Sequence, residues 1–210
     1  MRGSGSDRQD YTENTYANYR YYPEILSSML LPPELAASIQ KLRENRGGEI
    51  LGMTRLYERL DDWPVAHYAR YLLETGQKHK YQMLLYAHTA HSGHPELMCY
   101  YEQVGIDGRV WAPDCVPSLL TVPLMTGWMF AYQKIEDDSL LLLAGVPDSW
   151  FRKGFLAERV GYSGGSCQLE SDGENISIRF SAPLTLPAQL HTPTGIHNLP
   201  LGITEYTISL

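Results

Sequence analysis

Residues 86–118 read YAHTAHSGHPELMCYYEQVGIDGRVWAPDCVPS, and they separate two regions of helix-like hydrophobic pattern. Glycine and proline recur through this stretch, which predicts loops rather than a continuous helix. It also concentrates side chains that can titrate or bind a metal. These are His88, His91, His94, Glu96, Cys99, Glu102, Asp107, Asp114 and Cys115. Because titratable groups on loops between apolar helices are typical of functional sites, we place the candidate site in this stretch.

Upstream of this stretch, apolar residues recur with the spacing of two amphipathic helices. The first covers about residues 65–76 and the second about residues 77–93. The buried face expected for the first helix consists of Val65, Tyr68, Ala69, Leu72 and Leu73. The connection between the helices is short, so we expect them to pack antiparallel as a hairpin.

Downstream, residues 116–134 form the most apolar element, a buried helix that Pro123 is expected to kink or break. From about residue 136 the pattern changes to strands, with Ile176, Ile178 and Phe180 alternating along one of them. The sequence therefore predicts an α+β fold, with a helical part at 11–135 and a small antiparallel β-sandwich at 136–210. Residues 1–10 resemble disordered, vector-derived residues and are left out of this prediction.

Composition narrows the classes of partner. The net charge is -7 and no basic block occurs, which argues against nucleic acid. No run of about 18 apolar residues is present, so we expect no membrane span. Three cysteines without metal-site spacing predict no disulfide framework, which favours the cytoplasm.

Three segments carry a resemblance to a known family. They are HSGHPELMCYYEQV (91–104), PDCVPSLLTVPL (113–124) and AGVPDSWF (144–151). Together they resemble the C-terminal part of bacterial glycoside-hydrolase-like proteins, in which an (α/α)6 barrel of paired helices carries an appended β-sandwich. The resemblance extends over nearly all of residues 15–210. It implies that the helical part is made of hairpins from a partial α/α toroid.

The resemblance also implies a truncated fragment. A full toroid needs about twelve helices, whereas this chain has room for about five or six. Helices taken out of a toroid would expose apolar faces, which a soluble monomer does not tolerate. We therefore expect a homodimer or a higher oligomer in which these faces meet across a symmetry axis.

Glu102 is the first candidate for chemistry, because the glutamate of the YEQV motif lies by the substrate cleft in the family that the chain resembles. The expected function is binding or hydrolysis of a carbohydrate in a polar cleft around Glu102 and His88. Glycoside hydrolysis ordinarily uses two carboxylates, and the second would be Asp114 or Asp107. Each acid could instead cap a helix or a backbone amide.

The histidines suggest an alternative. His88 and His91 share a helix face and His94 follows the helix, so the three imidazoles could bind Zn²⁺ or another divalent metal. A metal-bound water would then hydrolyse phosphoesters or esters. Satisfied loop or helix-end histidines are the simpler interpretation, and no cofactor follows with certainty from the sequence.

Other side chains of the stretch have both a functional and a structural interpretation. Cys115 stands at an expected helix N-terminus, where a thiolate is favoured, and it could form a nucleophilic pair with a histidine. Tyr86, Tyr101 and Trp111 could line a sugar-stacking groove. For all four, a core position is the more common interpretation. A third hypothesis for the whole chain is a non-catalytic sugar-binding or assembly module.

Overall fold

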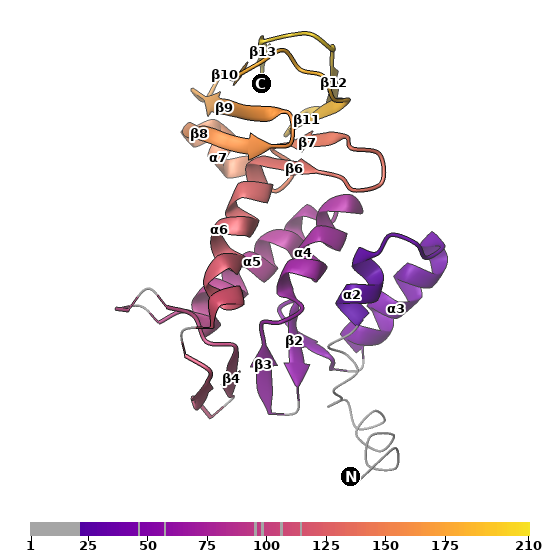
Figure 1. The fold of residues 1–210 in the computed structure, drawn as a ribbon, viewed down its shortest axis with the longest axis vertical. Helices are drawn as coiled ribbons and strands as arrows, with labels where there is room; N and C mark the ends of the chain where they lie inside the picture. The colour runs from indigo at the N-terminus through magenta and orange to yellow at the C-terminus, as the bar shows by residue number, and fades with distance from the viewer. Residues whose placement is uncertain are drawn as a thin grey trace. The chain divides into compact units, whose positions relative to one another are not determined.

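A computed structural model describes residues 22–210 apart from residues 46, 57, 95, 98, 106 and 114 (Figure 1). The helices are α2 (Tyr22–Ser27), α3 (Pro33–Asn45), α4 (Val65–Glu74), α5 (Lys78–Ser92), α6 (Val116–Phe130) and α7 (Asp148–Lys153). The chain divides into two units, Met1–Leu124 and Met125–Leu210. Residues 1–10 lie outside the described residues.

Helices α4 and α5 form where the hydrophobic spacing predicts them, and they pack against each other. The face of α4 predicted to be buried is buried throughout. It contacts α2 as well as α5, so three helices share one core in the N-terminal unit. The periodicity of 3.6 residues was enough to predict this part of the core.

The prediction of a partial toroid is wrong, because the N-terminal unit contains a five-stranded sheet. Its order is β1-β2-β3-β4-β5 and every neighbouring pair is antiparallel. The strands are β1 (Glu49–Ile50), β2 (Met53–Leu56), β3 (Arg59–Asp61), β4 (Gln103–Gly105) and β5 (Val110–Trp111). A toroid consists of consecutive helical hairpins, whereas here segments before α4 and after α5 pair with each other. Strands of two to four residues are too short to show a period of two.

Helix α6 runs from Val116 to Phe130 with Pro123 inside it, so the proline does not divide the helix into two elements. Pro123 has no backbone N–H to donate to the preceding turn. The helix begins in the N-terminal unit and ends in the C-terminal one.

The C-terminal unit contains two four-stranded sheets, and this also corrects the expected purely antiparallel sandwich. One sheet has the order β13-β10-β9-β8 and is antiparallel. The other has the order β12-β11-β7-β6, and its central pair, β7 and β11, is parallel. The strands are β6 (Ala131–Gln133), β7 (Leu140–Leu142), β8 (Phe155–Tyr162), β9 (Gly165–Ser171), β10 (Asn175–Phe180), β11 (Ala188–Thr192), β12 (Gly195–Leu199) and β13 (Glu205–Ser209).

Alternation along β10 places Ile176, Ile178 and Phe180 in the core, as the sequence predicts. Strand β7 is buried on both faces, because all three of its leucines are buried. A continuous apolar run of this kind is typical of a strand in the middle of a sheet, and β7 lies between β6 and β11.

Candidate functional site

Several elements of the N-terminal unit converge on a group of buried polar side chains. Asp61 ends β3, Asp62 follows it, His88 and Ser92 lie one turn apart on α5, and Ser118 lies in the first turn of α6. All five side chains are at most 3% exposed. We call these five residues the buried polar cluster. Burial of so many polar groups is costly unless they interact with one another or with a ligand.

Backbone pairing brings Glu102 to the edge of this cluster. Strands β3 and β4 pair with Asp61 opposite Gln103, and the Asp62 N–H donates to the Glu102 carbonyl at 3.0 Å. The Tyr101 N–H donates to the Ser92 carbonyl at 2.9 Å, so the segment before β4 is held between β3 and α5. The Glu102 side chain is half-buried and therefore keeps contact with solvent.

Asp62 is an acid of the cluster whose pKa is strongly shifted. Its burial raises the pKa to about 7 from the ordinary value of 3.8. The Ser118 hydroxyl opposes this rise because it favours the charged carboxylate, whereas the negative charges of Asp61 and Glu102 add to it. A carboxyl group with a pKa near neutrality both gives up and takes up a proton at physiological pH, as general acid–base catalysis requires.

His88 is buried in the neutral form. Burial lowers its pKa to about 4, and the nearby backbone of Ser118 opposes this only in part. The imidazole stacks on the Tyr100 ring, with 5.3 Å between centroids and 15° between planes. Neither ring nitrogen completes a hydrogen bond with the described residues. Because the Ser118 backbone lies beside one ring nitrogen, at least the other nitrogen is available to a polar molecule.

Two serine hydroxyls of the cluster are also buried without a hydrogen bond of normal geometry to any described residue. Ser92 Oγ and Ser118 Oγ are buried and complete no hydrogen bond of normal geometry within the described part of the chain, although Ser118 lies beside Asp62. Buried hydroxyls without such a bond are rare in proteins and call for a specific explanation, such as a ligand. The cluster thus combines an acid–base carboxyl with donors and acceptors suited to a hydroxylated molecule.

The structure does not bring the three histidines of the metal hypothesis together. His88 is buried, whereas His91 is exposed on the same helix. His94 lies beyond the helix end, where its Nδ1 accepts from the N–H groups of Glu96 and Leu97 at 3.2 Å each. Among the described residues no group of three or more His, Cys, Asp or Glu is placed to hold a metal ion.

The aromatic candidates lie at different places. Tyr86 is exposed on α5. Tyr101 is half-buried and meets His94 edge-on at 6.3 Å. Trp111 is half-buried, and the Arg59 guanidinium lies 3.7 Å from its ring centroid. The sugar-contacting role expected for these three residues stays a prediction.

Of the remaining candidates, Asp114 lies outside the described residues. Cys115 is a half-buried free thiol just before α6. Asp107 is exposed, and it accepts hydrogen bonds from the side chain and the N–H of Arg109. These bonds lower the Asp107 pKa, so this carboxylate stays charged and stabilises its own turn.

Asp61, Asp62, Ser92 and Ser118 were not predicted as site residues. In the sequence, Asp61-Asp62 before Trp63-Pro64 indicates a helix cap, and Ser118 indicates another. One signal in the sequence could have indicated the site. A helix cap needs only one aspartate, so the second aspartate of the pair calls for another explanation.

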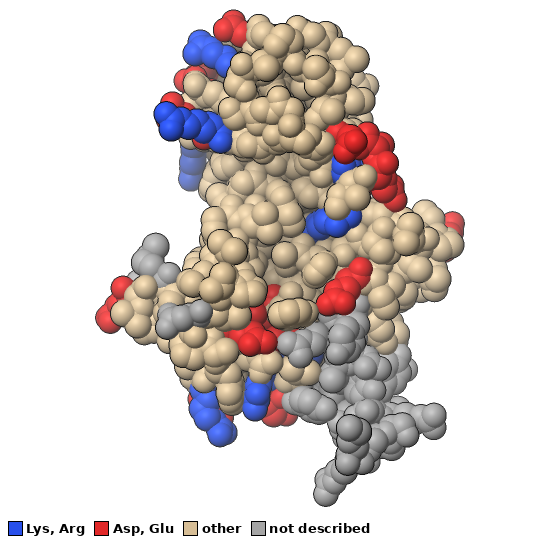
Figure 2. Space-filling model, in the orientation of Figure 1, with Lys and Arg blue, Asp and Glu red and all other residues tan. Residues whose placement is uncertain are grey.

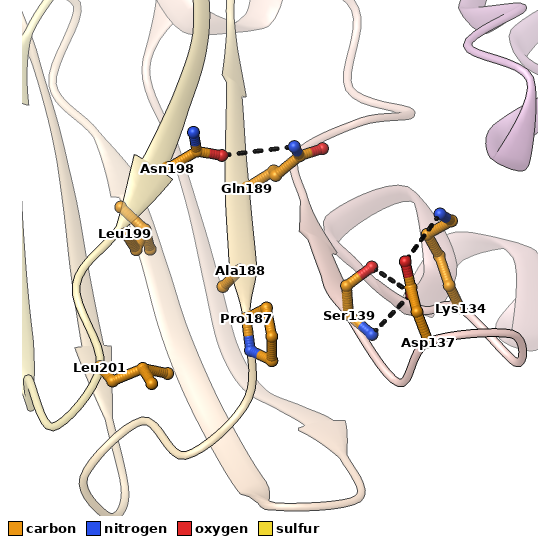
Figure 3. Close-up of a pocket in the computed structure, with 9 residues that line it drawn as sticks. All are labelled: Lys134, Asp137, Ser139, Pro187, Ala188, Gln189, Asn198, Leu199 and Leu201. Atoms are coloured by element: carbon orange, nitrogen blue, oxygen red, sulfur yellow. Dashed lines mark hydrogen bonds and ion pairs between the residues drawn. The ribbon is translucent and has the colours of Figure 1, made fainter.

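The C-terminal unit contains a separate pocket of about 370 Å³ (Figure 3). One wall is the connection between β6 and β7, where Asp137 accepts from the Ser139 hydroxyl at 2.6 Å and from Lys134 Nζ at 3.3 Å. The opposite wall is formed by β11 and β12, where Gln189 Nε2 donates to Asn198 Oδ1 at 3.3 Å. The remaining lining residues are Pro187, Ala188, Leu199 and Leu201.

Figure 2 shows Lys and Arg in small groups beside Asp and Glu, rather than a continuous basic surface on the face drawn. No helix within the described ranges is long and apolar enough to cross a membrane.

Comparison with protein-family models and with curated proteins finds no family model and no curated protein that matches the chain.

Proposed function

We propose that the N-terminal unit is a hydrolase acting on a carbohydrate, with Asp62 as the acid–base group and Glu102 as the second carboxylate. The observation that carries this proposal is the buried Asp62 carboxyl, which titrates near neutral pH beside a second, more accessible acid. Glycoside hydrolysis requires one carboxyl group that holds a proton and another that is charged. Asp62 and Glu102 supply this difference in environment.

The remaining polar groups support a hydroxylated substrate. His88, Ser92 and Ser118 each present buried hydrogen-bonding atoms, and sugar hydroxyls both donate and accept. The resemblance of residues 91–104 to glycoside-hydrolase-like proteins supports the same substrate class. The proposal does not need the toroid, because the β3–β4 pairing alone brings Asp62 and Glu102 together.

Asp62→Asn and Glu102→Gln should each lower kcat/KM for glycoside hydrolysis by about 10²- to 10⁴-fold, the usual contribution of an acid–base group. The measurement is the initial rate on a panel of aryl glycosides between pH 4 and 9. The wild-type profile should fall on its alkaline side near pH 7, where Asp62 loses its proton.

Asp107→Asn is the matched control, because Asp107 lies in the same part of the chain but is exposed and bonded to Arg109. It should leave the rate unchanged. An unaltered rate in Asp62→Asn, or no hydrolysis of any glycoside by the wild-type chain, would contradict the proposal. Activity lost on chelation and restored by zinc would favour the metal-dependent alternative through His88, His91 and His94.

We propose that the binding partner of the chain is a second copy of itself. Val116, Leu120 and Leu124 follow one another at four-residue intervals on α6 and are 62%, 59% and 42% exposed. Spacing of this kind places them on one apolar stripe. A cytoplasmic location stays a prediction from the cysteine content.

The α6 stripe should hold two copies of the chain together, because burying it against a second copy removes apolar surface from water. Light scattering should report a dimer or a larger assembly for the wild type and a monomer for Leu120→Glu. Ile196→Glu, which also introduces a charge at an exposed apolar position, should leave the assembly intact. A monomeric wild type would overturn this prediction.

A further inference from the structure

We propose that the pocket between the β6–β7 connection and strands β11 and β12 binds a neutral polyhydroxylated ring, such as a monosaccharide (Figure 3). The proposal does not depend on the acid–base site, because every lining residue belongs to residues 134–201. Ligand pockets in proteins range from about 300 to 1,000 Å³. A pocket of about 370 Å³ is therefore suited to a small ligand.

The two amides of the pocket provide its specific hydrogen bonds. Gln189 and Asn198 are directly paired across the antiparallel strands β11 and β12, so their side chains lie on the same face of the sheet. Their mutual bond uses Gln189 Nε2 and Asn198 Oδ1. Gln189 Oε1 can still accept and Asn198 Nδ2 can still donate. A donor and an acceptor side by side match adjacent hydroxyl groups, each of which does both.

The charged side chains of the lining compensate each other. Lys134 Nζ lies 3.3 Å from Asp137, and the Ser139 hydroxyl and N–H also donate to that carboxylate. These bonds lower the Asp137 pKa, with the Ser139 hydroxyl as the largest cause. Because one cation and one anion of the lining cancel, the pocket has no net charge to attract a strongly anionic or cationic ligand.

The rest of the lining is apolar and suits the C–H face of a sugar ring. Leu201 is 63% exposed at the rim, and Ala188 and Leu199 form a buried part of the wall. Apolar walls with a few fixed polar groups are the usual composition of small-molecule sites. Strands hold both amides, so the hydrogen-bonding groups are positioned before the ligand arrives.

The test is a titration of the ¹⁵N-labelled full chain with glucose, galactose, mannose and xylose, followed by NMR. At least one sugar should shift the side-chain NH₂ signals of Gln189 and Asn198. Asn198→Ala and Gln189→Ala should each weaken that binding about tenfold, as expected for loss of a hydrogen bond to a ligand. Gln168→Ala, which removes an amide from the other sheet, should leave the affinity unchanged.

Failure of this proposal is distinguishable from failure of the acid–base site. The Asp62→Asn chain should bind the sugar with wild-type affinity, whether or not it has lost hydrolytic activity. No shift of the two amide signals with any of the four sugars would overturn the proposal. Tighter binding of glucuronate or glucosamine than of the neutral sugars would overturn it as well, because it would require an uncompensated charge in the pocket.

Discussion

Asp62→Asn should make the free energy of unfolding rise with pH between about 4 and 6.5 relative to the wild type, and His88→Gln should make it fall with pH. The opposite signs follow from two buried groups that are both neutral in the folded chain. In the wild type their effects compensate over this window. Each substitution therefore reveals the pH dependence of the group that remains.

For Asp62 the folded pKa is about 7 and the ordinary value is 3.8. Between these values the unfolded chain has lost the proton and the folded chain keeps it, so folding becomes less favourable as the pH rises. At about 1.4 kcal/mol per pH unit, the full difference is about 4 kcal/mol. Above pH 7, Asp62→Asn should therefore be more stable than the wild type by up to about 4 kcal/mol, because asparagine carries no charge.

For His88 the folded pKa is about 4 and the ordinary value is 6.5. Between these values the unfolded chain binds a proton and the folded chain does not, so folding becomes less favourable as the pH falls. The full difference is about 3 kcal/mol. In Asp62→Asn only the pH dependence caused by His88 remains, so the free energy of unfolding rises with pH. In His88→Gln only the pH dependence caused by Asp62 remains, so the free energy of unfolding falls with pH.

The measurement is urea denaturation at several pH values from 4 to 8, followed by circular dichroism and tryptophan fluorescence. Asp107→Asn is again the control, because the Asp107 pKa lies below 3.8 and its loss changes little above pH 4. Parallel curves for the wild type, Asp62→Asn and His88→Gln would show that the two groups are not held neutral. That result would also remove the basis of the acid–base proposal.

The two kinds of error in the sequence-based prediction have different physical causes. Helix α4 could be predicted because ten residues show a full amphipathic period, and β10 because three apolar residues alternate. The sheet β1–β5 could not, because its strands have only two to four residues and its central pairing, β3 with β4, joins segments far apart in sequence. Such pairing is a tertiary effect that overrides local pattern.

The sequence indicates only part of the candidate site, because the rest depends on tertiary structure. His88 and Glu102 stand in a stretch rich in titratable residues, so composition indicates them. Asp62 and Ser118 stand near helix starts, where the sequence predicts caps. The structure differs, because Pro64 is the N-cap of α4 with no side-chain cap bond and Ser118 lies inside α6. Only the convergence of β3, α5 and α6 shows that their side chains are buried beside one another.

Arg43→Met should destabilise the N-terminal unit by about 3–5 kcal/mol, the usual cost of removing one partner from a buried ion pair. Arg43 is 0% exposed and pairs with Glu49, whose side chain is 15% exposed. Its Nη2 donates to the Gly52 carbonyl at 2.8 Å and to Thr54 Oγ1 at 2.9 Å. One side chain of α3 thus holds both strands of the β1–β2 hairpin and the turn between them.

The loss would come mainly from the groups left behind. Burial already raises the Glu49 pKa even though Arg43 opposes it, so without Arg43 this carboxyl should bind a proton more readily still. Arg43→Met should therefore be most destabilising at high pH, where Glu49 must be charged, and less so in acid. The same urea series measures this, and a cost independent of pH would contradict the role given to Glu49.

A double substitution separates loss of the pair from loss of packing. In Arg43→Met/Glu49→Leu no charge is left buried, so much of the stability should return, since apolar replacements of buried ion pairs are often neutral or better. Arg179→Ala, which breaks an exposed pair with Glu205 at 3.7 Å, should cost less than about 1 kcal/mol. If the double variant were as unstable as Arg43→Met, the bonds to Gly52 and Thr54 rather than the charge of Glu49 would be what Arg43 contributes.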